Sequence, residues 1–232
     1  SSPNRLLTMK YILILTALIS YGALASDFDD TKALADRGDA GAQVNLGTMY
    51  ADGYGVPEND AEAVKWFRKA ADQGNAEAQS ELGYMYAMGE GVPENHAEAV
   101  KWLRKAADQG HQNAQVRLGT MYSRGEGVPE NAAEAVKWWR KAAHHGNALA
   151  QLKLGVVYYK GIGVRKDYVM AYVFTSMAKA QQHQLRADIQ VQSQQGISLV
   201  LDRLKSKMSK KKILQAQALA FKCYESDYKD CD

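Results

Sequence analysis

Hydrophobic and polar positions repeat with a step of 36 residues along most of this chain. The residues that keep this step are of four types: Pro57, Pro93 and Pro129; Trp66, Trp102 and Trp138; Gly47, Gly83, Gly119 and Gly155; and Tyr50, Tyr86, Tyr122 and Tyr158. Recurrence at a fixed step of this size is typical of an array of small structural units. The pattern predicts four repeats, at 38–73, 74–109, 110–145 and 146–181.

Each repeat predicts two antiparallel helices. In the second repeat the apolar positions of the first helix are spaced i, i+4, i+7 and i+8, at Ala78, Leu82, Met85 and Tyr86. A Gly- and Pro-containing segment, 89–93, ends it, and Asn95 is placed to cap a second helix whose apolar face is Ala99, Trp102, Leu103 and Ala106. Gly110 stands where a helix C-terminus favours glycine. One helix pair cannot bury its apolar face alone, so neighbouring repeats must stack.

Gly83 and its equivalents lie inside the first helix of each repeat. A glycine there costs about 1 kcal/mol relative to alanine, so its recurrence calls for a packing reason. We expect close approach of two helices at Gly83, with Trp102 or Tyr86 as the bulky neighbour.

The recurring residues resemble the Sel-1-like repeat, a relative of the tetratricopeptide repeat. The resemblance rests on Ala78-Gln79-x-x-Leu82-Gly83-x-Met85-Tyr86, Gly89-x-Gly91-Val92-Pro93 and Ala99-x-x-Trp102-x-x-x-Ala106-Ala107. A fourth copy, from Ala150 to Ala178, has Phe174 in place of Trp and Arg165 in place of Pro. The resemblance implies an all-α fold, a right-handed αα superhelix or TPR-like solenoid. It also implies a protein that binds proteins, with no catalytic centre and no cofactor.

The ends of the array are expected to carry capping helices. Residues 26–37 resemble a lone second helix, and 182–232 form the C-terminal cap. Val173, Ser176 and Met177 stand where the second repeat has Lys101, Arg104 and Lys105, so another segment must cover this face. We expect one helix through about Lys207, interrupted or bent near Gly196, and a last helix from the N-cap Ser209 to about Glu225.

The candidate binding residues are those that vary between repeats on the first helices, which line the concave face in this kind of solenoid. They are Asn45, Thr48 and Asp52; Glu81, Tyr84 and Met88; Arg117, Thr120 and Arg124; and Lys153, Val156 and Lys160. Each set occupies one helical face, and its formal charge runs −1, −1, +2, +2 from repeat to repeat. This predicts a protein or peptide partner with acidic residues at the C-terminal end of the groove. The alternative is unselected drift on a solvated face.

Second helices carry a set that does not vary. Glu62, Lys65 and Lys69 recur as Glu98, Lys101 and Lys105 and as Glu134, Lys137 and Lys141, and predict a solvated outer face with i,i+3 ion pairs.

Composition excludes several other classes. With 46% apolar residues, 2 cysteines and a net charge of +3 in 232 residues, the chain is neither disordered, nor disulfide-dense, nor strongly basic. The run Lys210-Lys211-Lys212 has no interleaved aromatic residue, so no nucleic-acid partner is expected.

The N-terminal segment has the pattern of a secretory signal peptide. Met9 and Lys10 precede an apolar run, 11–22, and then Ala23-Leu24-Ala25, which predicts cleavage after Ala25 and a periplasmic or secreted protein. The competing interpretation is a membrane anchor, but 15 apolar residues are fewer than the roughly 20 that span a bilayer, so no stable membrane span is expected. Residues 1–8 precede Met9 and are set aside.

Export would determine the expected oxidation state of the two cysteines. Cys223 and Cys231 are eight residues apart, and an oxidising compartment favours a disulfide between them over a redox-active pair. Paired cysteines tie helices together in cysteine-rich secreted relatives, which implies that this bond would secure the C-terminal cap.

No constellation for chemistry stands out. His144 and His145 are adjacent at a predicted helix end, and His111 follows one, so no metal site is predicted. Some cysteine-rich relatives carry a β-lactamase label, and Ser176 with Lys179 and Ser209 with Lys212 match Ser-x-x-Lys, but the accompanying Ser-Asp-Asn and Lys-Thr-Gly motifs are missing. The chain is therefore predicted not to be an enzyme, with a weak hydrolase acting on a β-lactam or cell-wall peptide as the alternative.

A host protein is a further possible partner, because exported repeat proteins that this chain resembles take part in contact with a host.

Overall fold

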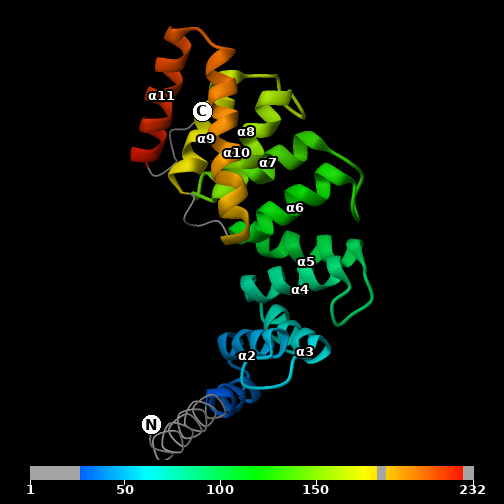
Figure 1. Ribbon diagram of the computed structural model, residues 1–232. Helices are drawn as coiled ribbons and strands as arrows, with labels where there is room; N and C mark the ends of the chain where they lie inside the picture. The colour runs from blue at the N-terminus through cyan, green and yellow to red at the C-terminus, as the bar shows by residue number, and fades with distance from the viewer. Residues whose placement is uncertain (1–26, 182–186, 227–232) are drawn as a thin grey trace, which may run out of the picture. The chain divides into compact units, whose positions relative to one another are not determined.

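The structure is a computed structural model that describes residues 27–181 and 187–226, with side chains at 27–181 and 197–226. The ordered elements in these ranges are helices, and no strand occurs there (Figure 1). The predicted signal segment and Cys231 lie outside the described residues. The chain forms two compact units, divided between Asn95 and His96.

The first unit contains a helical segment over 27–36, then α2 (Ala40–Asp52), α3 (Asp60–Asp72) and α4 (Ala76–Met88). The second unit contains α5 (His96–Asp108), α6 (Gln112–Arg124), α7 (Ala132–Ala143), α8 (Ala148–Lys160), α9 (Tyr168–Ala180), α10 (Ala187–Ser206) and α11 (Lys210–Glu225). The first helices of the repeats are thus α2, α4, α6 and α8, and the second helices are α3, α5, α7 and α9.

Polar caps decide where the helices begin. Asn59 Oδ1 accepts the backbone N–H of Glu62 at 3.1 Å, and Asn131 Oδ1 accepts that of Glu134 at 3.0 Å, as expected for second helices. First helices use Asp39, Asn75 and Asn147 in the same way, and His111 replaces them in the third repeat. At the other end, each first helix stops at a glycine in the left-handed region, such as Gly125 with φ 70°.

The glycines inside the first helices of three repeats, Gly47, Gly119 and Gly155, are points of close helix contact, as expected, but their neighbour is not the recurring Trp or Tyr. A Cβ on Gly47 would lie 2.8 Å from the Phe67 ring, and a Cβ on Gly119 would lie 2.6 Å from Trp139 Nε1. At Gly155 the nearest atom is Thr175 Oγ1. The contacted side chain is therefore the one directly after the recurring Trp position, because that residue points from the second helix onto the first helix of the same repeat.

A second set of glycines brings successive repeats together. A Cβ on Gly91 would lie 2.3 Å from the carbonyl oxygen of Asp60, and one on Gly127 would lie 2.3 Å from that of His96. Gly163 makes the same approach to Ala132. Backbone meets backbone at these points, so only glycine fits, and the loop of one repeat lies against the start of the second helix in the repeat before it.

Buried glutamines add a hydrogen bond at the same kind of junction. Nε2 of Gln79 donates to Ala71 O at 3.1 Å, and Nε2 of Gln115 donates to Ala107 O at 3.1 Å. Gln151 does the same to Ala143 O. In the first repeat, Gln43 donates to Ala35 O, so the segment 27–36 takes the place of a preceding second helix. Each bond satisfies a carbonyl at the C-terminal end of a helix, which has no partner within that helix.

Second helices also carry aromatic contacts with cations. Lys69 Nζ lies 3.6 Å from the ring centroid of Trp66, and the same geometry recurs in Lys105 with Trp102 and Lys141 with Trp138. The lysine thus covers the tryptophan, whereas the ion pair of the outer face is formed by the other lysine, as in Lys137 with Glu134 at 2.8 Å. The predicted i,i+3 pairs are confirmed at Glu62–Lys65, Glu98–Lys101 and Glu134–Lys137.

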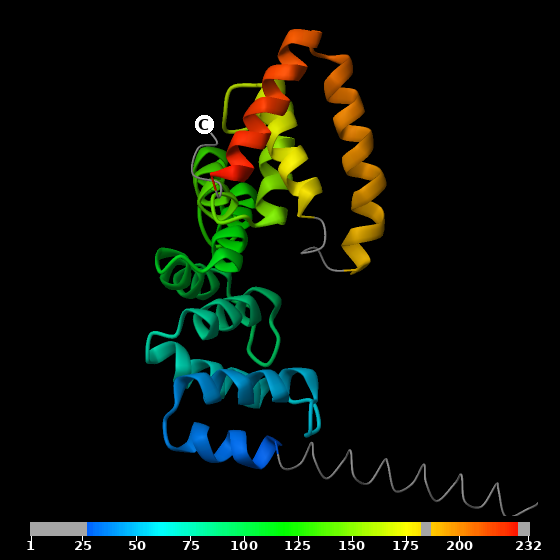
Figure 2. The same ribbon diagram turned by 90° about the vertical axis from the view of Figure 1, so that its left-hand side faces the viewer.

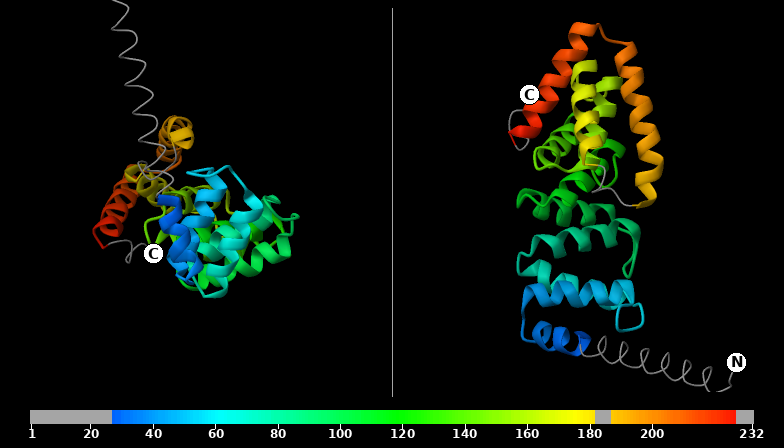
Figure 3. Two further views of the ribbon diagram at one scale, coloured as in Figure 1. Left: turned by 90° about the horizontal axis from the view of Figure 1, so that it is seen from below. Right: turned by 60° about the vertical axis from the view of Figure 1, so that its left-hand side comes forward.

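The uncharged face of α9 is covered as the sequence predicts. Helix α9 lies between α10 and α11 (Figures 2 and 3), and Val173 and Met177 are buried there. Cys223 of α11 places its Sγ 3.4 Å from Met177 Sδ. Ser209 caps α11 as expected, but α10 runs through Gly196 without the expected interruption.

No helix in the described ranges is long and apolar enough to cross a membrane.

Replacing Gly119 with Ala tests the close contact. The added methyl group must displace Trp139, whose Nε1 donates to Val116 O at 3.2 Å. Overpacking costs about 1–3 kcal/mol and the gain in helix propensity returns about 1 kcal/mol, so we expect a net loss of about 1–2 kcal/mol in chemical denaturation. The same substitution should cost less stability in a Trp139→Leu background, in which the smaller side chain copies Leu103 of the second repeat and leaves room for the methyl group. Additive effects of the two substitutions would contradict the contact.

Candidate functional site

All twelve residues predicted to form the binding face are exposed or half-buried, while the recurring Trp, Leu and Ala positions are buried. In the first unit Asn45, Thr48, Asp52 and Met88 are exposed, and Glu81 and Tyr84 are half-buried. In the second unit Arg124, Val156 and Lys160 are exposed, and Arg117, Thr120 and Lys153 are half-buried. These side chains are therefore accessible in the part of the chain that the structure describes.

The first unit holds a cavity of about 380 Å³ between α2, α3 and α4. Four of the six predicted residues of this unit line it: Thr48, Asp52, Glu81 and Tyr84. Asp60, Glu77 and Glu90 bring its carboxylates to five, and no lysine or arginine lines it. We call this feature the acidic cavity.

The elements explain how these groups converge. Thr48 and Asp52 lie one turn apart on α2, and Glu77, Glu81 and Tyr84 lie on successive turns of α4. Buried Phe67 and Met85 supply an apolar part of the lining. A cavity with this lining suits a cationic side chain with an apolar stem, such as lysine or arginine.

The residues predicted from the sequence and those that line the cavity differ in two ways. Three of the five carboxylates were not among the predicted residues, and two predicted residues do not line the cavity. Asp60 and Glu77 lie in first turns of helices, where an acid is expected for the helix dipole alone. Glu90 lies in a loop. Asn45 and Met88 do not line the cavity.

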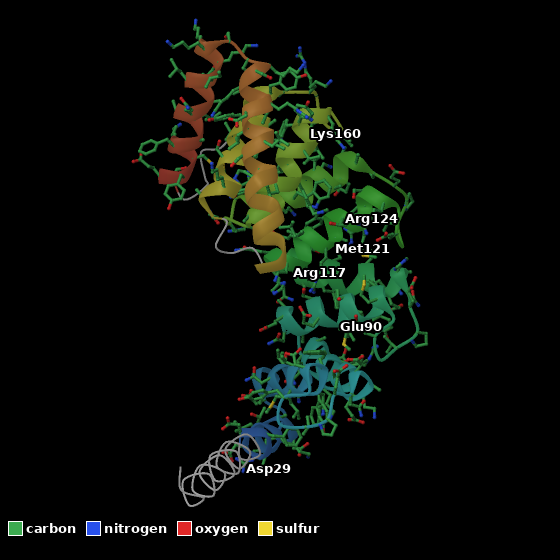
Figure 4. All side chains as sticks on the ribbon, viewed as in Figure 1. Asp29, Glu90, Arg117, Met121, Arg124 and Lys160 are labelled. Atoms are coloured by element: carbon green, nitrogen blue, oxygen red, sulfur yellow. The ribbon has the colours of Figure 1, made fainter. Side chains whose placement is uncertain are left out.

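In the second unit, two of the predicted cations, Arg124 and Lys153, act on each other. The pKa of Lys153 is lowered, first because burial disfavours the ammonium form and second because the Arg124 guanidinium repels it. Lys153 Nζ also lies 5.3 Å from the ring centroid of Trp139, and Arg124 pairs with Glu126 at 3.5 Å. Arg117 lies near the middle of α6 and Arg124 is its last residue, and Lys160 lies at the end of α8 (Figure 4).

The remaining positions of this face are neutral. Thr120 Oγ1 donates to Val116 O at 2.9 Å, and Thr48 Oγ1 donates to Val44 O at 3.1 Å. Each hydroxyl thereby keeps its oxygen available as an acceptor. Val156 adds an apolar side chain that is 45% exposed.

Most of the residues considered for metal binding or catalysis lie at helix ends, where they cap or terminate a helix. His111 Nδ1 accepts the backbone N–H of Ala114 at 3.3 Å as the cap of α6, and His144 ends α7. Ser209 Oγ accepts the backbone N–H of Lys212 at 3.4 Å as the cap of α11, and Ser176 is half-buried on α9, with Lys179 exposed. Among the described residues, no group of three or more His, Cys, Asp or Glu side chains is placed to hold a metal ion.

Paired helices, a 36-residue step and a variable exposed face define the class of αα-repeat proteins. A family model of the Sel1 repeat matches residues 40–75, 76–111, 112–147 and 148–183, so the chain belongs to the Sel1 repeat family. Its all-α fold, of the TPR-like solenoid class, is confirmed.

Solved structures agree with this assignment. A protective antigen present in uropathogenic Escherichia coli strains, which displays an SLR fold, is 44% identical over 68% of this chain, with a TM-score of 0.66. This chain covers 34% of that protein, about a third of its length. A Sel1 repeat protein from Oxalobacter formigenes is 37% identical, with a TM-score of 0.63, over 72% of this chain and 70% of its own. Comparison with curated proteins gives no match.

Replacing Lys153 with Met tests the charge on this face. The ordinary pKa of a lysine is 10.5, and the folded protein lowers it, so charged Lys153 destabilises the fold at neutral pH and the penalty falls as the pH rises toward 10.5. We expect the variant to melt about 1–3 °C higher at pH 7, because the apolar stem remains. The difference should shrink in melting curves recorded toward pH 10.5.

Lys160→Met, at an exposed position of the same helix, serves as the control for loss of one positive charge. A gain for Lys153→Met that is the same at every pH would indicate packing instead of charge.

Proposed function

We propose that this protein is a binding scaffold that holds a protein partner against the exposed faces of its first helices. Sel1 repeats are generally protein-interaction scaffolds, and the chain has four of them. The observation that carries the proposal is the acidic cavity, which collects four of the residues that vary between repeats. The convergence of variable positions on one cavity supports a binding site over drift on a solvated face.

The two units carry opposite charges at the predicted binding residues, so each unit favours partner residues of the opposite sign. The five carboxylates of the acidic cavity favour a segment with lysine or arginine. Arg117, Arg124, Lys153 and Lys160 in the second unit favour acidic residues. The proposed partner is therefore a protein or peptide with both, and its acidic residues contact the C-terminal repeats.

The proposal includes no catalytic step. Ser209 already serves as a helix cap, and no observation favours the hydrolase alternative.

We further propose that the scaffold acts in the periplasm or outside the cell. The pattern of residues 9–25 supports export, and the Escherichia coli relative is described as a protective antigen, which favours an exported location and admits a host protein as partner. Export would place Cys223 and Cys231 in an oxidising compartment. A disulfide between them would then hold the end of α11, where Cys223 is buried against Met177 of α9.

Charge reversal on the first helices tests the scaffold. The mature form from Ser26 would be crosslinked in the exporting cell and its partner identified by mass spectrometry. Recovery of that partner should fall at least about tenfold for Asp52→Lys with Glu81→Lys, and again for Arg117→Glu, Arg124→Glu, Lys153→Glu and Lys160→Glu, because close charge pairs at interfaces contribute more than 1 kcal/mol each.

The matched control reverses Lys65, Lys101 and Lys137 to Glu on the outer face of the second helices, where exposed pairs contribute little. Equal recovery from all variants, with unchanged melting temperatures, would refute binding through the first helices.

Intact mass tests export and the disulfide together. Protein recovered from the periplasm or medium should begin at Ser26 and weigh about 2 Da less than its reduced form, because two thiols lose one hydrogen each. Reduction should lower its melting temperature, since the bond closes the loop that anchors α11. A mass that retains residues 9–25 would contradict cleavage, and a fully reduced mass would contradict the disulfide.

A further inference from the structure

A second and larger cavity, of about 880 Å³, lies in the second unit where α9 begins, beside the turn between α10 and α11. Five cationic side chains line it: Arg140, Arg165, Lys166, Lys207 and Lys212. None of the twelve residues of the predicted binding face takes part. We call this feature the basic pocket.

The carboxylate of this lining is already engaged. Asp167 Oδ1 accepts the backbone N–H groups of Val169 and Met170 at 2.8 and 3.1 Å, as the cap of α9. Within the described part of the chain, the salt bridges do not involve Arg165, Lys166, Lys207 or Lys212. The five cations of the pocket therefore outnumber its one carboxylate, and gathering an excess of like charges costs free energy.

Arg140 is held in place before any ligand arrives. Its guanidinium donates to the Tyr158 hydroxyl, the same contact that Arg104 makes with Tyr122 and Arg68 with Tyr86. Nε of Arg140 is buried and has no hydrogen-bond partner among the described residues. A guanidinium fixed in this way can bind an anion at little cost in conformational entropy.

The internal repeats show that this charge is not needed for folding. The equivalent loops of the first three repeats read Pro-Glu-Asn, at 57–59, 93–95 and 129–131, with a charge of −1, whereas 165–167 read Arg-Lys-Asp, with a charge of +1. The backbone geometry is nevertheless the same. The Cβ position of Gly161 lies 3.3 Å from the backbone N of Lys166, and that of Gly125 lies 3.3 Å from the backbone N of Glu130.

We propose that the basic pocket binds an acidic peptide segment that also carries an apolar residue. Val164, Met170 and Met208 line the pocket beside the cations, so a ligand that fills it has both characters. A small inorganic anion would leave most of the volume unfilled. Bases of a nucleic acid stack on open aromatic faces, but both tyrosines of the lining already contact another ring: Tyr158 is stacked on Phe174, and Tyr168 lies against Tyr159, each at 5.7 Å between centroids.

The test uses a fluorescein-labelled peptide of five residues, Asp-Glu-Leu-Asp-Glu, and fluorescence anisotropy with the purified chain. Arg165→Pro with Lys166→Glu restores the residues of the other loops and is expected to fold. This variant should weaken peptide binding at least about fivefold, because the charge of Arg165 is lost and that of Lys166 is reversed. Binding should also weaken with added salt.

Matched controls separate the pocket from general charge. Glu130→Lys in the third repeat, and Lys65→Glu with Lys137→Glu on the outer face of the second helices, should leave peptide affinity unchanged. Arg165→Pro with Lys166→Glu should in turn leave capture of the scaffold partner unchanged in the experiment above, so failure of one proposal does not imply failure of the other.

Three outcomes would overturn the basic pocket as a peptide site. They are equal binding by the Arg165→Pro with Lys166→Glu variant, equal binding of a neutral Asn-Gln-Leu-Asn-Gln peptide, and displacement of the acidic peptide by pyrophosphate or a short single-stranded oligonucleotide at lower concentration than by unlabelled peptide.

Discussion

The fold depends on contacts between backbones at positions where no side chain fits. Gly127 approaches the carbonyl of His96 so closely that a Cβ would lie 2.3 Å from it, and Gly91 does the same at Asp60. Buried glutamines such as Gln115 then join each first helix to the end of the preceding second helix. These contacts set the spacing of successive repeats, and the apolar residues fill the volume that this spacing leaves.

Such tight constraints limit variation in the core more than on the surface. The recurring Trp, Leu and Ala positions are buried, and replacing them would leave cavities or overpack the helices. Exposed turns of the first helices and the fourth loop carry no such constraint. Asp52, Glu81 and Lys166 therefore differ in charge from their counterparts in other repeats.

The acidic cavity and the basic pocket carry opposite charges. The acidic cavity of the first unit is lined by five carboxylates, and the basic pocket of the second unit is lined by five cations. A net charge of +3 for the whole chain conceals both. Electrostatic attraction at each feature would orient a partner more than it would raise the total affinity, because exposed charges are screened by salt.

The sequence by itself determined the repeat length, the helix pairs, the caps at Asn59, Asn131 and Ser209, and the covering of α9, because these follow from local periodicity and from polar side chains next to helix ends. It identified Thr48, Asp52, Glu81 and Tyr84 as exposed and variable. Tertiary structure alone decided that Phe67 and Trp139, not the recurring Trp, contact the helix glycines. It also decided that Asp60, Glu77 and Glu90 join one cavity and that Arg165 and Lys166 meet Lys207 and Lys212. The physical reason is that these groups lie on different helices and loops, and their distances depend on how the helices pack.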